Sequence, residues 1–157
     1  MKPEFSGAEI VSCAVCWNGK RSISYPWAKE AIVATAELCF NSDFPKVGWN
    51  IKFEDRWFRY FLKNSVQGWL FDGMLSTHIL DNRKGITGLK FQAFAELGIE
   101  PYEHVVKPYL QSDDKNHLNR IRELDLPTLL KYGGYDALYE YVICKRQVKQ
   151  MKDKSET

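Results

Sequence analysis

Residues that favour β-strands gather near the start of the chain and predict a β-hairpin. The run AEIVSCAVCWNGKRSISYPW contains two such segments, and Asn18-Gly19 lies between them. Asn-Gly between two strand-forming runs is the strongest short-range signal for a hairpin, because both residues tolerate a positive φ. We therefore expect the two segments to pair antiparallel.

Helical and strand-like patterns alternate in the middle of the chain. Apolar residues at helical spacing predict a helix from Ala28 to Phe40. The short run KVGWNI predicts a strand, and the aromatic-rich segment FEDRWFRYFLKN after it predicts a second helix. Another short strand is expected to end near Phe71, where Asp72 is placed to cap the next helix and is expected to do this rather than to bind a metal.

The last third of the chain predicts two further helices around an irregular segment. One helix is expected from about Leu89 to Leu97, where Gly98 and Pro101 end it, and residues 107–119 are polar and irregular. The final helix is expected to begin near Leu126 or Pro127. Its apolar side is formed by Leu130, Ala137, Leu138, Tyr141, Val142 and Val148.

These elements predict one layered α/β or α+β domain over residues 1–150, followed by a disordered, lysine-rich tail at 151–157. The 157 residues, of which 45% are hydrophobic, suffice for one core and are too few for two ordinary domains. A net charge of +2 does not by itself indicate a nucleic-acid-binding protein. No membrane-length apolar run and no signal-peptide pattern is present, so we expect a cytoplasmic protein without membrane partners.

The four cysteines are expected to be reduced thiols rather than metal ligands. Cys13 and Cys16 have C-x-x-C spacing, but they lie in a predicted strand, where residues three apart point to opposite faces. Cys39 and Cys144 provide no second pair. Buried, reduced thiols are the ordinary state of such residues.

The segment LKYGGYDALYEYV places two glycines in what otherwise looks like a helix. Glycine inside a helix costs about 1 kcal/mol relative to alanine. The Gly133-Gly134 pair therefore indicates either a helix start or a place where another group comes close to the backbone. Tyr132 and Asp136 are four residues apart, so on a helix their side chains lie on one face and can contact the same small bound group.

Three segments together resemble a known family. VGWNIKFEDRW, GWLFDGMLSTHILDNRKGITGLKFQAFAELGIEPY and LLKYGGYDALYEYV are similar to the second motif, the intervening segment and the third motif of the DnaQ-like 3'-5' exonucleases. These are the proofreading domains of family A DNA polymerases and their phage relatives. The resemblance runs from about Glu9 to about Gln150. It implies a ribonuclease-H-like fold, with a mixed sheet flanked by helices, in a bacterial or phage-infected cell.

The resemblance also implies which residues act. Asp136 would bind metal and Tyr132 would orient the attacking water, while the glycines would let the terminal nucleotide or a neighbouring strand approach. The second motif is usually Asn-x-x-Phe/Tyr-Asp, and here it begins at Asn50 and has Glu54 at the aspartate position, with Asp55 next to it, so either acid is a candidate ligand. Two cations, Mg²⁺ or Mn²⁺, held by clustered carboxylates would generate hydroxide and stabilise the leaving oxygen.

The first motif of the family, Asp-x-Glu followed by Thr-Gly, is missing. In the family it lies on a central strand, and the resemblance implies that this sequence begins just after that strand. Without those two carboxylates, the chain alone is expected to hydrolyse DNA slowly or not at all. Losing that strand would expose two strand edges, which invite pairing with another chain. We therefore expect an upstream polypeptide or self-association to fill the gap.

Three interpretations remain open from the sequence. The chain is an exonuclease part acting on single-stranded DNA 3' ends, a non-catalytic module that binds nucleic acid or a DNA polymerase, or a remnant without an independent role. Asn50, together with Arg56, Arg59 and Lys63 on the helix after the second motif, could meet the nucleic acid, although an ordinary solvated face explains the three cations slightly better. The five tryptophans lie in apolar segments and are expected in the core.

Overall fold

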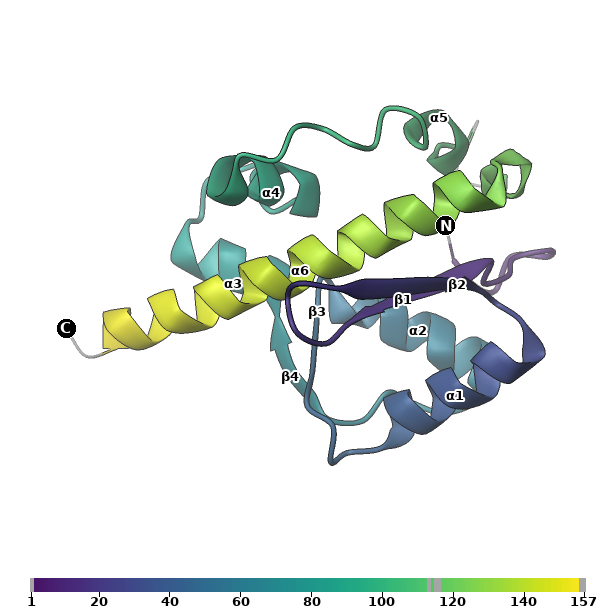
Figure 1. Ribbon diagram of the computed structural model, residues 1–157, viewed down its shortest axis with the longest axis horizontal. Helices are drawn as coiled ribbons and strands as arrows, with labels where there is room; N and C mark the ends of the chain where they lie inside the picture. Colours follow the sequence, from purple (N-terminus) through teal and green to yellow (C-terminus); the bar gives the residue numbers. More distant parts are fainter. Residues whose placement is uncertain (1, 113, 115–116, 156–157) are drawn as a thin grey trace.

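A long C-terminal helix runs through the middle of the molecule, and the other elements pack around it (Figure 1). The computed structural model describes residues 2–112, 114 and 117–155. The elements are β1 (Ser12–Cys16), β2 (Ser22–Pro26), α1 (Lys29–Phe40), β3 (Lys46–Gly48), α2 (Ile51–Leu62), β4 (Trp69–Asp72), α3 (Gly73–Leu80), α4 (Leu89–Leu97), α5 (Lys107–Leu110), a 3-10 turn η1 (Ile121–Glu123) and α6 (Leu126–Ser155).

The strands form two separate pairs, so the residues described contain no single mixed sheet, and the ribonuclease-H-like arrangement stays a prediction. β1 and β2 pair antiparallel, and β3 and β4 pair parallel, with each sheet containing only two strands. Nothing in the described ranges hydrogen-bonds β1 to β3, which is the physical reason that the sheet is divided. The fold is mixed α/β, as the sequence predicts.

The hairpin prediction is confirmed. Residues 17–21 connect the two strands, and Gly19 has a φ of +70°. The side-chain Oδ1 of Asn18 accepts hydrogen bonds from the backbone N–H groups of Lys20 and Arg21, both at 2.9 Å. The asparagine thus closes the loop through its own side chain.

The predicted role of Asp72 as a cap is confirmed, and the residue caps two helices. Its Oδ1 accepts hydrogen bonds from the N–H groups of Met74 (2.9 Å) and Leu75 (3.1 Å) at the start of α3. The same carboxylate accepts from Asn50 (3.1 Å, Oδ1) and Ile51 (3.0 Å, Oδ2) at the start of α2. One side chain therefore fixes two helix N-termini beside each other, where its negative charge is also favourable.

The two glycines in α6 let the hairpin pack directly on the helix backbone. A Cβ added at Gly133 would lie 3.2 Å from Ser24 Oγ, and one at Gly134 would lie 3.4 Å from Ser22 Oγ. Ser22 Oγ donates a 2.7 Å hydrogen bond to the carbonyl of Gly134. Of the explanations open from the sequence, close approach of a neighbouring strand is the one that the structure supports.

The core consists of two small clusters rather than one stripe along α6. Trp49, Leu89, Ala93, Ile143 and Cys144 form the first cluster, and Val106, Leu124 and Leu129 form the second. The six residues of the predicted apolar side of α6 are all half-buried, whereas the most deeply buried residues of the helix are Leu129, Ile143, Cys144 and Gln147. The helix is covered by the hairpin, β3, α3 and α4, so its buried residues do not follow a single face.

The remaining helix boundaries mostly follow the sequence signals. α4 coincides with the predicted range and ends at Gly98 with a φ of +68°. The segment predicted as irregular contains the short helix α5, while residues 113, 115 and 116 of it lie outside the described residues. The four cysteines are free thiols, and Cys144 is fully buried.

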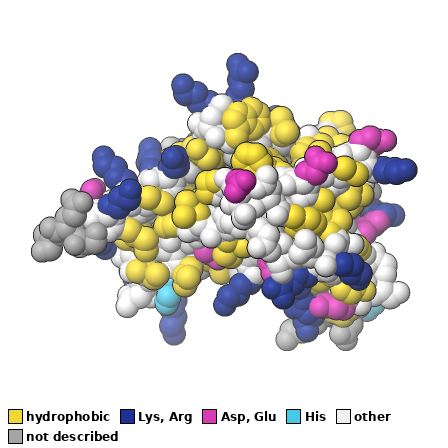
Figure 2. Space-filling model, turned by 90° about the horizontal axis from the view of Figure 1, so that it is seen from below, with side chains coloured by type: hydrophobic (Ala, Val, Ile, Leu, Met, Phe, Trp, Pro, Cys, Tyr) yellow, Lys and Arg dark blue, Asp and Glu magenta, His cyan; other side chains and the backbone are white. Residues whose placement is uncertain are grey.

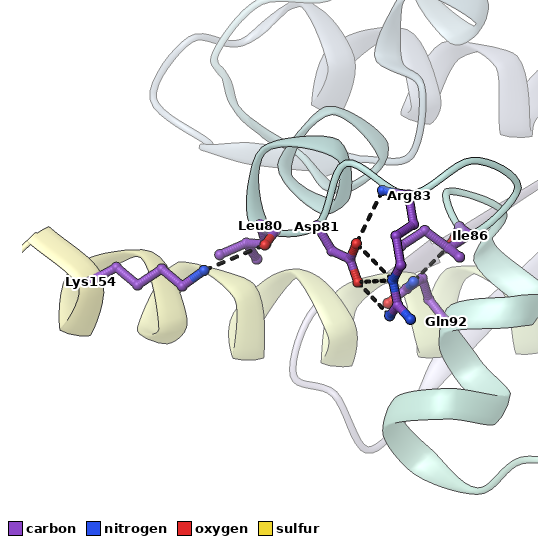
Figure 3. A network of polar contacts seen from close by, with 6 residues as sticks. All are labelled: Leu80, Asp81, Arg83, Ile86, Gln92 and Lys154. Atoms are coloured by element: carbon purple, nitrogen blue, oxygen red, sulfur yellow. Dashed lines mark hydrogen bonds and ion pairs between the residues drawn. The ribbon is translucent and has the colours of Figure 1, made fainter.

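The prediction of a disordered tail is wrong for residues 151–155, which continue α6, and residues 156 and 157 lie outside the described residues. Figure 3 shows a contact that holds the end of α6 against α3. The Nζ of Lys154 donates a 3.4 Å hydrogen bond to the carbonyl of Leu80 at the end of α3. Beside this contact, Asp81 pairs with Arg83 at 2.6 Å. Although α6 has 30 residues, no helix in the described ranges combines the length and apolar character that a membrane crossing needs.

The molecule exposes more surface than its mass predicts. Its accessible surface is 10243 Å², whereas a compact monomer of 18.3 kDa exposes about 8,100 Å². Apolar side chains cover much of the face shown in Figure 2. The end of α6, which projects past the other elements in Figure 1, accounts for part of the excess. Large exposed apolar surfaces commonly mark a place where a partner binds.

Candidate functional site

A cavity of about 550 Å³ opens between β1, α2 and α6. Apolar and aromatic side chains form much of its wall, among them Trp49 and Trp57. Its charged groups are mainly acidic, since four carboxylates and one ammonium reach it: Glu9, Glu54, Asp136, Glu140 and Lys90. A concave apolar site with a few convergent charged groups is the usual form of a binding or active site.

Two of the three acids selected from the motifs, Glu54 and Asp136, line this cavity. Glu54 is held in the first turn of α2, which the carboxylate of Asp72 caps. One of its oxygens, Oε2, is buried without a hydrogen-bond partner. Burial, together with the negative charge of Asp72, raises the pKa of Glu54 to about 7. A buried, unpaired carboxylate oxygen is costly, which favours a role in which something binds to it.

The carboxylate of Asp136 is already occupied by two groups from elsewhere in the chain. Lys90 Nζ on α4 contacts its Oδ2 at 2.6 Å, and the Tyr102 hydroxyl donates a 2.6 Å hydrogen bond to its Oδ1. Lys90 and Asp136 are only 25% and 26% exposed, so solvent screens this ion pair less than one on the surface. The sequence does not suggest either partner.

Tyr132 lies near Asp136 but is not among the residues that line the cavity. Its ring packs beside Tyr102, with 6.0 Å between the ring centroids, and Lys90 Nζ lies 4.7 Å from the ring centre. Burial raises the pKa of the Tyr132 hydroxyl well above its usual value, and the nearby Asp136 charge adds to the effect. The hydroxyl is therefore held in its neutral form.

Glu140 is a cavity residue that the sequence analysis missed. Burial, together with the negative charges of Glu54 and Asp136, raises the pKa of Glu140 to about 8, although the Lys90 ammonium opposes this rise. Glu140 follows Asp136 by four residues, and the same spacing joins Tyr132 to Asp136. Extending that helical spacing by one turn would have found it.

Asp55 is used elsewhere, and its predicted role as a metal ligand gains no support. Its Oδ1 accepts a 2.9 Å hydrogen bond from the N–H of Val66, and its Oδ2 lies 2.8 Å from Nε of Arg59. It does not line the cavity. Of the two acids that the motif left open, Glu54 is the one that lines the cavity together with Asp136.

The predicted nucleic-acid contacts are partly engaged within the chain. Arg56 pairs with Glu4 at 2.7 Å, and Arg59 with Asp55. Lys63 lies just after α2 in a left-handed conformation, with Nζ 5.0 Å from the Tyr60 ring centre. Asn50 begins α2, also in a left-handed conformation. Exposed pairs of this kind contribute little to stability, so a phosphate could displace them.

The residues present do not by themselves complete a site for two cations. In residues 2–112, 114 and 117–155 there is no group of three or more His, Cys, Asp or Glu side chains arranged to hold a metal ion. The Lys90 ammonium, which contacts Asp136, already provides the positive charge beside this carboxylate. Mg²⁺ or Mn²⁺ would need this pair to open and further oxygen ligands to be supplied.

Comparisons with protein-family models and with curated proteins find no match for this chain. The resemblance to DnaQ-like exonucleases therefore remains a prediction from the motifs.

Proposed function

We propose that this chain is part of a 3'-5' exonuclease domain of the DnaQ-like type, with a ribonuclease-H-like fold and single-stranded DNA 3' ends as substrate. The observation that supports the proposal most strongly is that Glu54 and Asp136, far apart in the sequence, line one cavity. Phosphodiester hydrolysis in such enzymes depends on acids gathered around divalent cations. Tyr132 beside Asp136 is consistent with the same motif.

The divided sheet is compatible with this fold. In the part of the chain that the structure describes, no strand pairs with both β1 and β3. A ribonuclease-H-like sheet would need one more strand between them, and that strand would bring the carboxylates that the cavity lacks. We accordingly propose that the chain alone cleaves DNA slowly or not at all.

A nuclease assay tests the proposal. The purified chain is incubated with 5'-labelled single-stranded DNA and Mn²⁺, with and without an added peptide that carries an Asp-x-Glu strand. The expected result is a ladder of products shortened from the 3' end only when the peptide is present, and no ladder with Asp136→Asn. Asp125→Asn, which changes an acid at the start of α6 outside the cavity, serves as the matched control and should cleave normally. If the peptide binds but produces no ladder, the exonuclease proposal is wrong.

One observation favours a second candidate, a non-catalytic module that binds nucleic acid or a DNA polymerase. Lys90 and Tyr102 occupy both oxygens of Asp136, as expected of a carboxylate that serves structure rather than metal binding. This alternative predicts DNA binding that Arg56→Ala weakens and that added Mn²⁺ leaves unchanged. The exonuclease proposal predicts instead that Mn²⁺ tightens binding.

A further inference from the structure

The positive charges of the chain are concentrated in two segments. Residues 10–28, which contain the hairpin, have two cations and no acid, and residues 141–154 of α6 have five cations and one acid. Together these segments hold seven cations and one acid, a net charge of +6, out of 22 Lys and Arg and 20 Asp and Glu in the whole chain. The other residues therefore hold 15 cations and 19 acids, a net charge of −4. Such asymmetry indicates a surface that binds a polyanion.

The tip of the hairpin, residues 17–21, and the end of α6 form one continuous surface. Gly19 packs on α6, because a Cβ added there would lie 3.2 Å from the ring of Tyr141. The Nζ of Lys145 lies 5.9 Å from the centre of the same ring. Lys149 follows Lys145 by about one helical turn, so both side chains lie on one face of α6. Figure 2 shows cationic side chains gathered around this end of the helix.

Four cations of this surface are available to a ligand. Each is exposed, and none takes part in an ion pair within the described ranges: Lys20, Arg21, Lys145 and Lys149. Two other cations on the end of α6 are used within the chain. Arg146 donates to the carbonyl of Glu96, and Lys154 donates to that of Leu80. The four remain for an external partner.

Trp17 lies at the start of the hairpin tip, in the same exposed loop as Lys20 and Arg21. Its side chain is 53% exposed, so the expectation that all five tryptophans lie in the core is wrong for this residue. Tryptophan is highly buried on average, which makes its exposure among cations informative. An exposed indole can stack on an unpaired base of any type, while neighbouring cations meet the phosphates.

A lipid surface fits this part of the molecule less well. A helix that lies on a membrane buries an apolar face in it. In residues 17–21 and 141–154, Trp17 is the only large apolar side chain that is exposed. A single-stranded nucleic acid offers both of the groups that the surface can bind, phosphates and unpaired bases.

We propose that the basic surface, formed by Trp17, Lys20, Arg21, Lys145 and Lys149, binds the phosphates and one base of a single-stranded nucleic acid. This surface is separate from the site described above. None of its five residues lines the cavity, and none belongs to the three segments that resemble the exonuclease family. Binding here needs neither a divalent cation nor cleavage, so the inference goes beyond the proposed function and does not rest on it.

Fluorescence anisotropy with a labelled oligothymidylate, measured in EDTA over a range of salt concentrations, tests this inference. Each phosphate neutralised on a single strand adds about −0.7 to the slope of log K against log salt concentration. Four cations therefore predict a slope of about −2.8, and the double variant Lys145→Ala, Lys149→Ala should bind more weakly, with a slope reduced in size by about 1.4. Trp17→Ala should weaken binding about tenfold and leave the slope unchanged, whereas Trp17→Phe, which keeps a ring, should retain most of the affinity.

A matched double variant, Lys84→Ala, Lys131→Ala, removes the same two charges from exposed positions elsewhere. Lys131 resembles Lys145, because it also lies on α6 with its Nζ beside a tyrosine ring, 5.8 Å from the centre of Tyr135. This variant should keep the slope. Equal losses in the two double variants would show that only the net charge matters, which overturns the inference.

Two other results also overturn it. The first is an oligothymidylate affinity that Arg56→Ala lowers and Lys145→Ala, Lys149→Ala does not, which would place the contact on α2. The second is binding to phosphatidylserine vesicles that depends on Lys145 and Lys149, with no binding to the oligothymidylate, which would make a lipid surface the partner.

The basic surface and the proposed exonuclease can fail separately. Oligothymidylate binding that depends on the basic surface, together with no ladder from the Asp-x-Glu peptide and Mn²⁺, would retain the surface and reject the exonuclease. A ladder of shortened products, together with a salt slope that Lys145→Ala, Lys149→Ala leaves unchanged, would do the reverse.

Discussion

Removing the carboxylate of Asp72 should loosen two helices at once. Four backbone N–H groups donate to this side chain, two at the start of α2 and two at the start of α3. Losing an N-terminal cap costs about 1 kcal/mol and up to about 2 kcal/mol per helix. For Asp72→Ala we therefore expect the free energy of unfolding to fall by about 2–4 kcal/mol, a large part of the stability of an ordinary domain.

Urea denaturation followed by circular dichroism measures this loss. Asp125→Ala is the matched control, because Asp125 caps α6 through a single hydrogen bond to the N–H of Thr128. It should destabilise the chain less than Asp72→Ala. Asp72→Asn should lie between wild type and Asp72→Ala, because its remaining carbonyl oxygen can still accept the three bonds made by Oδ1 and loses only the one from Ile51.

The reasoning would be refuted if Asp72→Ala and Asp125→Ala had the same urea midpoint. Equal midpoints would mean that water replaces the carboxylate at one of the two helix starts without cost. The position of Glu54 depends on the same cap, so its buried oxygen should become accessible in Asp72→Ala even where the helices persist.

Two further predictions concern packing and pH. Gly73→Ala should lower the free energy of unfolding, measured by urea denaturation, by about 1–3 kcal/mol, because its Cβ would lie 2.4 Å from the ring of Trp49. Gly88→Ala is the control: its Cβ would have no atom within 4 Å, so it should cost only the replacement of glycine at the N-cap of α4 and less than Gly73→Ala. Glu54 and Glu140 have an ordinary pKa of 4.5 and reach about 7 and about 8 when folded, so the unfolded chain loses these protons first. The free energy of unfolding should consequently fall as the pH rises from 4.5 to about 8, and a Glu54→Gln, Glu140→Gln double variant that kept the whole decline would contradict this.

Local signals in the sequence predict the elements well. The Asn18-Gly19 turn, the cap at Asp72 and the end of α4 at Gly98 each depend on residues within a few positions, and each is found in the structure. Such features are set by backbone conformation and nearby hydrogen bonds, which a single sequence displays directly.

Contacts between residues far apart in the sequence could not be predicted from these local signals. Nothing near Asp136 in the sequence indicates that Lys90 and Tyr102 close on its two oxygens. The predicted apolar side of α6 omits the most deeply buried residues of the helix, because several elements surround it whereas periodicity analysis assumes one covered face. Glu140 is different, since its helical spacing from Asp136 was visible in the sequence and was overlooked.

The central position of α6 has a consequence for how the protein is made. The hairpin is synthesised well before the surface on which it packs, since Gly134 follows its partner Ser22 by 112 residues. Until then the two strand pairs have no shared support. Packing of the strands must wait until α6 has been made, so they stay open to chaperones and to one another over that interval.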